Sequence, residues 1–412
     1  MPNSPIEKSK QGAWKKKSLG SCASIKARIG WQGLTTKEYL DSGAYYLITG
    51  TDFVDGRIDW NNCHFVSKDR FDQDPNIKIQ KGDVLVTKDG TIGKVAFLDK
   101  IPGPGTLNSG VFVIRSKDQH LSQRYLAKVF VSKYFDDFID SIVAGSTIVH
   151  LYQKDIVNFS FMVPPTVEEQ ERIADTLESI DALLIELDAY LDKKKAIREG
   201  VLQQLISGTT RLSGFSEKWN EVLFKSIYKF AKEGGTPSTS VPAYYQPATI
   251  PFAKIEDLKN KYLTRVDTYI SESGMEHSSA WLLPVNSVIL SNGATLGEVS
   301  INKIPTSTKQ GIIGIILKEQ FDPEFIYYLF KGRHFRREME RVTTHGTMDC
   351  AYIKDLNTIP LSIPSLPEQK AIATVLSSID EEIVWLEKQR DKYALIKQGM
   401  MQELLTGKTR LI

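Results

Sequence analysis

The feature that most constrains this sequence is a duplication. A stretch of 44 residues, 169–212, occurs again without a gap at 368–411, an offset of 199. The two copies share about 19 identical residues, far more than two unrelated helices share through composition alone. Both copies begin with Glu-Gln, and both end on a glycine followed, one residue later, by Thr-Arg-Leu. The chain therefore consists of two copies of one unit.

Both copies carry the signals of a long helix. Residues 166–169 (TVEE) and 365–368 (SLPE) read as capping boxes, in which a hydroxyl and a carboxylate satisfy amide groups at the helix start. Gly208 and Gly407 stand where a residue in the left-handed conformation ends a helix. Between these signals, eight of ten seam positions of a heptad are apolar in each copy. This pattern predicts two helices that pair along their length in a coiled coil.

Two further segments, 14–164 and 216–363, are expected to form mixed α/β (α+β) globular domains. Their short apolar runs lie between Gly, Asn and Pro, as strands do. GDVLVTKDGTIGKVAF at 82–97 aligns with NSVILSNGATLGEVSI at 286–301, although the residues around these landmarks differ. The alignment predicts one fold that carries two different surfaces.

The connections predict how the copies are arranged. The second domain begins soon after the first helix ends, so the second helix must run back antiparallel and return its end to the neighbourhood of Trp14. We expect a closed, circular, pseudo-two-fold arrangement with domains about 60 Å apart, because about 40 residues rise 1.5 Å each. In chain order the expected parts are an N-terminal segment (1–13), a first domain (14–164), a central repeated helix (165–208), a linker (209–215), a second domain (216–363), and a distal repeated helix with a C-terminal closure (364–412).

The composition excludes some classes of protein but does not indicate a function. The net charge of +2 gives no global attraction for nucleic acid. Two local clusters are strongly basic, and each is either a solvated face or a binding surface. The clusters are Lys8, Lys10, Lys15, Lys16, Lys17, Lys26 and Arg28 in the first, and Lys331, Arg333, Arg336, Arg337 and Arg341 in the second. The cysteines, Cys22, Cys63 and Cys350, are too scattered for a disulfide scaffold or a zinc site. No apolar run is long enough to cross a bilayer, so we expect a cytoplasmic protein.

The repeated segments resemble the specificity subunit of type I restriction–modification enzymes, and the resemblance covers nearly the whole chain. Its most specific parts are PPTVEEQERIA at 164–174, PSLPEQKAIA at 364–373, and the G-x-TRL ends at 208–212 and 407–411. The resemblance implies that each domain is a target recognition domain that reads one half of an asymmetric, split DNA sequence. It also implies that the helices act as a ruler between the halves. The first 45 residues depart from the family's usual patterns, so nothing is carried over there.

The resemblance also implies partners and cofactors. The expected partners are double-stranded DNA, two methyltransferase subunits and, through them, endonuclease and translocase subunits, with no membrane partner. S-adenosylmethionine, ATP and Mg are expected in the partner subunits, and no cofactor or metal in this chain.

The sequence has no visible catalytic constellation. The six histidines are scattered, and H-E-x-x-H, C-x-x-C and the N-P-P-aromatic methyltransferase motif are absent. A non-catalytic, DNA-reading subunit is therefore the leading hypothesis. One alternative is a stand-alone restriction or modification enzyme with a catalytic site in one domain. Another is a protein-interaction scaffold that does not contact DNA.

The candidate DNA-binding residues lie in glycine-containing loops and beside them. The loop at 87–94 offers lysines and hydroxyls to phosphates or base edges, and its counterpart at 291–297 offers an asparagine, which pairs well with adenine. Each loop is equally compatible with a plain turn. The candidates are Lys88, Thr91, Lys94, Ser146, Thr147 and Lys154 in the first domain, and Asn292, Thr295, Thr347 and Lys354 in the second.

Partner subunits are expected to dock on the outward faces of the helices. Glu178, Glu186, Trp385 and Gln389 lie off the mutual seam. Trp385 is the strongest candidate, because exposed aromatic side chains often anchor another protein. The alternative is that this tryptophan packs on its own domain.

Overall fold

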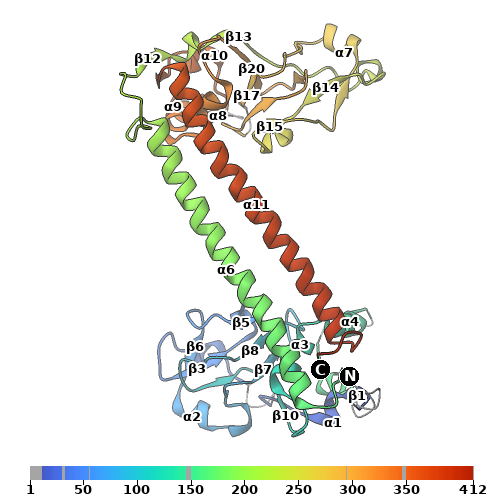
Figure 1. The fold of residues 1–412 in the computed structure, drawn as a ribbon. Helices are drawn as coiled ribbons and strands as arrows, with labels where there is room; N and C mark the ends of the chain where they lie inside the picture. Colours follow the sequence, from blue (N-terminus) through green and yellow to red (C-terminus); the bar gives the residue numbers. More distant parts are fainter. Residues whose placement is uncertain are drawn as a thin grey trace, which may run out of the picture. The chain divides into compact units, whose positions relative to one another are not determined.

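The computed structural model of the chain describes residues 12–29, 33–54, 56–144, 150–293, 295–345 and 349–411. It divides into two compact units, and Figure 1 shows the ribbon with many of the helices and strands labelled. Unit 1 comprises residues 1–188 and 389–412, and unit 2 comprises residues 189–388. Each unit therefore holds one globular domain and a part of both repeated helices.

Unit 1 follows a mixed order of strands and helices. Its elements are β1 (Lys15–Ser18), α1 (Leu19–Cys22), β2 (Ala23–Ala27), β3 (Tyr45–Ile48), β4 (Phe53–Val54), β5 (Arg57–Ile58), β6 (His64–Val66), α2 (Lys68–Asp72), β7 (Val84–Thr87), β8 (Val95–Phe97), β9 (Gly105–Leu107), β10 (Val111–Ser116), α3 (Gln123–Phe130), α4 (Lys133–Val143), α5 (Gln153–Ile156), β11 (Ser160–Val163) and the first part of α6 (Val167–Ile206).

Unit 2 repeats this order with few changes. Its elements are the rest of α6, β12 (Asn220–Leu223), β13 (Tyr228–Glu233), β14 (Ile250–Ala253), β15 (Tyr262–Leu263), β16 (Tyr269–Ile270), α7 (Glu272–Glu276), β17 (Val288–Ser291), β18 (Val299–Asn302), β19 (Ser307–Thr308), β20 (Ile312–Leu317), α8 (Pro323–Lys331), α9 (Arg333–Val342), α10 (Ile353–Leu356), β21 (Pro360–Ile363) and the first part of α11 (Leu366–Leu404).

The sheets of the two units have the same topology. Unit 1 has a sheet ordered β2-β10-β7-β8, and unit 2 has β13-β20-β17-β18 with β15 added at the edge. The smaller sheets, β6-β3-β9 and β16-β14-β19, also correspond, as do the pairs β1-β11 and β12-β21. The register agrees as well, because Val111 lies opposite Thr87 and Ile312 lies opposite Ser291. The predicted mixed fold, present in two copies, is confirmed.

The central strands are buried on both faces. In β7, Val84 and Val86 belong to the core under the helices, while Leu85 belongs to a second core under the small sheet. In β17 of unit 2, Val288 and Leu290 belong to the core under the helices of that unit, and Ile289 belongs to the core under its small sheet. Successive side chains of a strand point to opposite faces, so a continuous apolar run here fills two layers.

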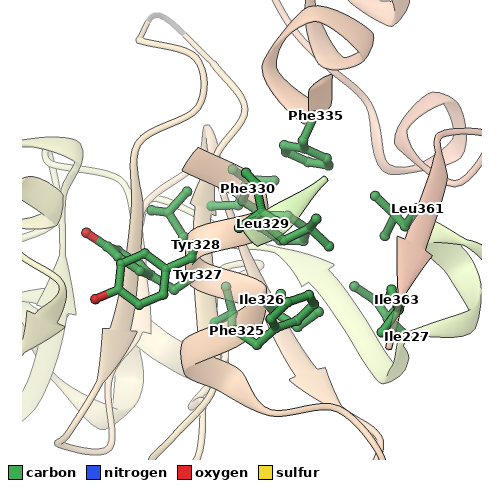
Figure 2. Close-up of a cluster of buried hydrophobic side chains, with 14 of the residues drawn as sticks. Ile227, Phe325, Ile326, Tyr327, Tyr328, Leu329, Phe330, Phe335, Leu361 and Ile363 are labelled. Carbon is green, nitrogen blue, oxygen red and sulfur yellow. The ribbon is translucent and has the colours of Figure 1, made fainter. Parts of the chain in front are cut away.

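The helix α8 carries much of the core of unit 2. All six residues from Phe325 to Phe330 are buried. Figure 2 shows Phe330 close to Phe335 of α9, with Leu361 and Ile363 of β21 nearby. The Phe330 and Phe335 rings stack with their centroids 4.2 Å apart. A helix that is apolar all round must be enclosed on every side, as α8 is.

Within each unit the long helices pair through ions as well as apolar contacts. In unit 1, Lys397 binds Asp181 at 2.6 Å and Arg390 binds Asp188 at 3.0 Å. In each unit the residue number rises along α6 as it falls along α11, so the predicted antiparallel pairing is confirmed within both units.

In unit 2, Arg198 binds Asp380 at 2.8 Å and Lys194 binds Glu382 at 2.7 Å. An apolar cluster of Leu191, Ile383 and Leu386 lies between the helices of this unit. Charged residues at seam positions are therefore paired across the seam.

The helix ends confirm one prediction and correct another. Gly208 and Gly407 have φ angles of +70° and +73°, the predicted left-handed conformation. The predicted capping box at 166–169 is wrong in one of its two hydrogen bonds. The Glu169 amide donates to Thr166 Oγ1 at 3.3 Å, but the Glu169 carboxylate binds Arg410 at 2.8 Å and 2.9 Å. A guanidinium that makes two charge-assisted bonds holds a carboxylate more strongly than one amide does.

Two segments that are far apart in the sequence, around Trp14 and around Gly407, meet in unit 1. The Trp14 indole donates to Glu169 Oε1 at 3.3 Å and lies against Gly407, where a Cβ atom would be 2.8 Å from the ring. The predicted return of the C-terminal end to Trp14 is confirmed. The spacing of about 60 Å between domains stays a prediction. Among the described residues, no helix has the length and apolar character to cross a membrane.

Candidate nucleic-acid interface

The loop after β7 is held by one hydroxyl. Thr87 Oγ1 donates to the Thr91 carbonyl at 2.6 Å and accepts from the Lys94 amide at 2.9 Å. Gly93, with φ of +81°, completes the turn. Thr91 and Lys94 are exposed on this loop. The loop therefore presents two predicted DNA-binding side chains on a turn whose shape is fixed by hydrogen bonds.

The loop after β17 repeats the same turn. Ser291 Oγ donates to the Thr295 carbonyl at 2.5 Å and accepts from the Glu298 amide at 2.8 Å. Thr295 is exposed. The sequence analysis did not predict that Thr87 and Ser291 hold these turns. The feature that could have revealed it is a hydroxyl residue at the last position of the strand in both copies.

Main-chain bonds bring a second segment beside each loop. In unit 1 the Leu151 amide donates to the Lys88 carbonyl at 2.9 Å, and in unit 2 the Ala351 amide donates to the Asn292 carbonyl at 2.9 Å. Lys154 and Lys354 follow in the next helices, so the structure groups them with the loops. The other three candidates, Ser146, Thr147 and Thr347, lie outside the described residues.

Lys88 is only partly available in unit 1. Its side chain is 17% exposed, and Nζ lies 4.0 Å from Asp89 Oδ2. The other oxygen of Asp89 contacts His150 Nδ1, so the lysine shares its counter-ion with a histidine. Lysines commonly contact DNA phosphates, and Lys88 remains a candidate for such a contact.

Asn292, the equivalent of Lys88, is fully buried in unit 2. Its Nδ2 donates to the Ala351 carbonyl at 3.1 Å, while its Oδ1 has no hydrogen-bond partner among the described residues. Contact between Asn292 and adenine stays a prediction, and it requires the side chain to rotate out of this position.

Each predicted lysine on α5 and α10 lies beside an exposed tyrosine. Lys154 Nζ lies 5.4 Å from the Tyr152 ring centroid, and Lys354 Nζ lies 5.7 Å from that of Tyr352. The tyrosines are 51% and 46% exposed. Exposed aromatic rings next to cations suit nucleic acid, because they offer stacking and phosphate contacts together. The sequence prediction named only the lysines, although a tyrosine stands two residues before each of them, in YQKD at 152–155 and YIKD at 352–355.

The predicted partner residues differ in exposure. Trp385 is 58% exposed and so does not pack on its own domain. Glu186 is exposed and Gln389 is half-buried. Glu178 accepts a hydrogen bond from Arg124 at 2.6 Å within unit 1, so it is already engaged by its own domain.

Large apolar side chains are exposed on both long helices. They recur at equivalent positions, since Ile185 and Val384 are 199 residues apart, and so are Ile197 and Ile396. The full set comprises Ile185, Leu395 and Ile396 in unit 1, and Tyr190, Ile197, Val384 and Trp385 in unit 2. The two copies of the helix therefore expose apolar side chains at matching positions.

In the part of the chain that the structure describes, no group of three or more His, Cys, Asp or Glu side chains is arranged to hold a metal ion.

Comparisons with known proteins agree on one family. The family described as type I restriction modification DNA specificity domain matches residues 12–198 and 216–394. A specificity subunit of a type I restriction enzyme (MjaVIII) from Methanocaldococcus jannaschii is 26% identical over 362 residues, covering 81% of each chain. The EcoR124I/EcoR124II specificity subunit of Escherichia coli is 27% identical over 217 residues, covering 51% of this chain and 52% of that one.

Two solved structures have a similar fold. The type I restriction–modification S subunit from M. genitalium has a TM-score of 0.56 and 17% identity, covering 96% of this chain and 97% of that chain. A chain from a study of complex assembly and conformational transition in a type I restriction–modification system has a TM-score of 0.61 and 17% identity, covering 96% and 98%.

Proposed function

Because the chain belongs to the type I restriction modification DNA specificity family, as a specificity subunit with two target recognition domains, we propose that it reads an asymmetric, two-part DNA target. One domain reads each part, and the long helices set the number of unread base pairs between them. The chain itself is non-catalytic in this proposal, and it acts in the cytoplasm, where the DNA lies.

One observation carries the proposal, namely the same loop built twice with different side chains. Thr87 and Ser291 brace equivalent turns, but Lys88 is replaced by Asn292 and Lys94 by Glu298. Identical scaffolds position these side chains at equivalent sites, and the chemistry offered to a base edge differs between units. Two half-sites of different sequence follow from this difference.

The ruler is supported by the register of the helices. The pair Asp181–Lys397 in unit 1 and the pair Asp380–Arg198 in unit 2 are related by the offset of 199 in both members. Ion pairs across the seam resist sliding of one helix along the other, because a shift separates the charges. A helix pair of fixed register is a suitable spacer.

We propose two methyltransferase subunits as the proteins that cover the exposed apolar side chains of the helices. Endonuclease and translocase subunits would join through them. S-adenosylmethionine, ATP and Mg would then be bound by these partners. The support from this chain is the repetition of the exposed Ile185 and Ile197 at Val384 and Ile396, since equivalent exposed side chains suit two equivalent partners.

The test is to incubate the purified chain with plasmid DNA, Mg²⁺ and S-adenosylmethionine, alone and with its methyltransferase subunits. The proposal expects no cleavage and no methylation by the chain alone, and methylation at a two-part site by the assembled complex. Cleavage or methylation by the chain alone would instead support a stand-alone enzyme. Failure of the complex to bind any DNA would support a protein-interaction scaffold.

A further inference from the structure

Two equivalent helices carry opposite charge. In unit 2, α9 contains four arginines and two glutamates, a net charge of +2. In unit 1, α4 contains one lysine and three aspartates, a net charge of −2. Both helices bury the same face, through Phe135 and Ile139 in α4 and through Phe335 and Met339 in α9. The charge reversal is therefore confined to the solvent-facing side of one structural element.

The arginines of α9 face water. The side chains of Arg333, Arg337 and Arg341 are 77%, 75% and 61% exposed. Glu338 is the carboxylate that Arg337 and Arg341 share, at 3.9 Å and 2.8 Å. Arg333 lies 3.6 Å from Glu199 of α6. Arg336, which is exposed, is therefore the arginine of this face that keeps its charge without a carboxylate within 4.0 Å among the described residues, and the helix keeps its net charge of +2.

The helix α9 leads directly to the candidate interface of its unit. Two residues after α9 ends, Thr344 forms a β-bridge with Cys350. The next residue, Ala351, donates its amide to the Asn292 carbonyl at 2.9 Å. The arginine face and the loop after β17 are therefore joined by a short, hydrogen-bonded path of main chain.

The basic residues lie on different elements in the two units. The loop of unit 1 carries Lys88 and Lys94, where the loop of unit 2 has Asn292 and Glu298. Glu298 pairs with Lys331 at 3.1 Å, so this lysine beside the loop is already bound to a carboxylate. Where unit 2 lacks loop lysines, it has the α9 arginines.

We propose that the exposed arginines of α9 bind DNA phosphates on the half-site that unit 2 reads. In unit 1 the loop lysines take this role, and the aspartates of α4 cannot. The proposal rests on the proposed function and adds which element anchors each half-site. Guanidinium groups bind phosphate through paired hydrogen bonds, and each phosphate neutralised releases counter-ions from the duplex.

The test uses the full chain assembled with its methyltransferase subunits. Arg336→Gln with Arg337→Gln is compared with the wild type and with Asp136→Asn plus Asp137→Asn, the matched change on α4. Affinity is measured by fluorescence anisotropy against salt, for a duplex with the target and for one without it. The buried Phe335 and Met339 keep α9 folded in the variant, which circular dichroism and the melting temperature check.

We expect the arginine variant to lower the slope of log affinity against log salt by about 2, since each lost phosphate contact removes about 0.9. Between about 50 and 200 mM salt it should then lose roughly tenfold less affinity than the wild type. Affinity for both duplexes should fall, and the methylated sequence should not change. In the control variant the slope should not fall.

An unchanged slope in a folded arginine variant would overturn the proposal. So would an unchanged slope together with a shift in sedimentation, because the face would then be a contact with a second copy of the chain. These failures are distinct from failure of the proposed function, in which the wild-type complex shows no preference for its target duplex.

Discussion

Unit 1 and unit 2 attach their globular domains to the long helices through the same side chains. Glu169 binds Arg410 in unit 1, and Glu368 binds Arg211 in unit 2, each through two hydrogen bonds of 2.6–2.9 Å. The glutamates are 5% and 1% exposed. The glutamine that follows each glutamate bonds the main chain at the start of α3 or α8 in the same way. These glutamate–arginine and glutamine contacts, which form the joint between helix and domain, are thus the same in the two units. The indoles differ, because Trp14 donates to Glu169, whereas Nε1 of Trp219 has no hydrogen-bond partner among the described residues.

Close to this joint, the side chain at one equivalent position of α3 and α8 has opposite charge in the two units. Arg124 of α3 in unit 1 binds three carboxylates of α6, namely Glu171, Asp175 and Glu178. Its equivalent in α8 is Glu324, which accepts hydrogen bonds in unit 2 from Lys261, Tyr262 and Ser377. The carboxylates of the joint are buried, so loss of either arginine would leave a charge without a partner. The half-exposed contacts beside it have been rebuilt, which shows how one scaffold carries two different surfaces.

The largest expected effect is on the part that the two units share. Inserting four residues at Lys195 of α6 adds about 6 Å of rise and shifts the heptad by a stutter. The insertion separates Lys195 from Glu387, to which it is now paired at 2.7 Å. We expect methylation at the original two-part target to be lost, and a target with a longer spacer to be gained. Full-rate methylation of the original site by the insertion variant would refute the ruler.

A second set of variants compares the buried ion pairs of the joint with the half-exposed ion pairs beside it. Arg211→Ala and Arg410→Ala each leave a buried carboxylate unpaired, so each should lower the free energy of unfolding by about 2 kcal/mol. Arg124→Ala removes half-exposed ion pairs and should cost less than about 1 kcal/mol. Urea unfolding of the three variants measures this order. Equal losses at all three positions would contradict the distinction between joint and surface.

A third change compares equivalent positions on the helices. Trp385→Ala should weaken assembly with the methyltransferase subunits by about 1 kcal/mol or more, since large aromatic side chains dominate binding energy. The matched control is Glu186→Ala, the same position in the other copy, which should have a smaller effect. Isothermal titration calorimetry gives both dissociation constants. An unchanged constant for Trp385→Ala, with normal circular dichroism, would remove this residue from the interface.

The smallest expected effect concerns pH. Burial alone would raise the pKa of Asp181, but hydrogen bonds from Lys128 and Lys397 hold this pKa below its usual value of 3.8. The stabilisation is therefore present above pH 3.8 and is lost as the pH falls below it through the folded-state pKa. Asp181→Asn should lose stability at neutral pH and show a shallower decline in acid. Parallel acid-unfolding curves for variant and wild type would contradict this.

Sequence predicted the parts whose signals are local. The duplication, the helices, their left-handed ends at Gly208 and Gly407, and the paired seam all follow from spacing along the chain. The second role of Glu169 was not predictable in this way, because its partner Arg410 lies 241 residues away. The capping-box pattern fitted the local sequence, and a distant guanidinium took the carboxylate instead.

The candidate site was predicted less completely than the fold. Thr91, Lys94 and Thr295, which the sequence offered as DNA-binding candidates, are exposed, and their contact with DNA stays a prediction. Residue type alone gave no sign that Asn292 would be buried, since an asparagine in a glycine-containing loop is usually exposed. Burial depends on how the next segment packs over the loop, which is a tertiary contact with no local signal.

The central claim is that each unit reads its own half-site independently. The most direct measurement is to replace residues 14–164 with the equivalent domain of a relative and to map methylation across a host genome. We expect one half of the target to change while the other half and the spacer stay the same. If both halves changed together, or if the target did not change, the two-domain account would be wrong.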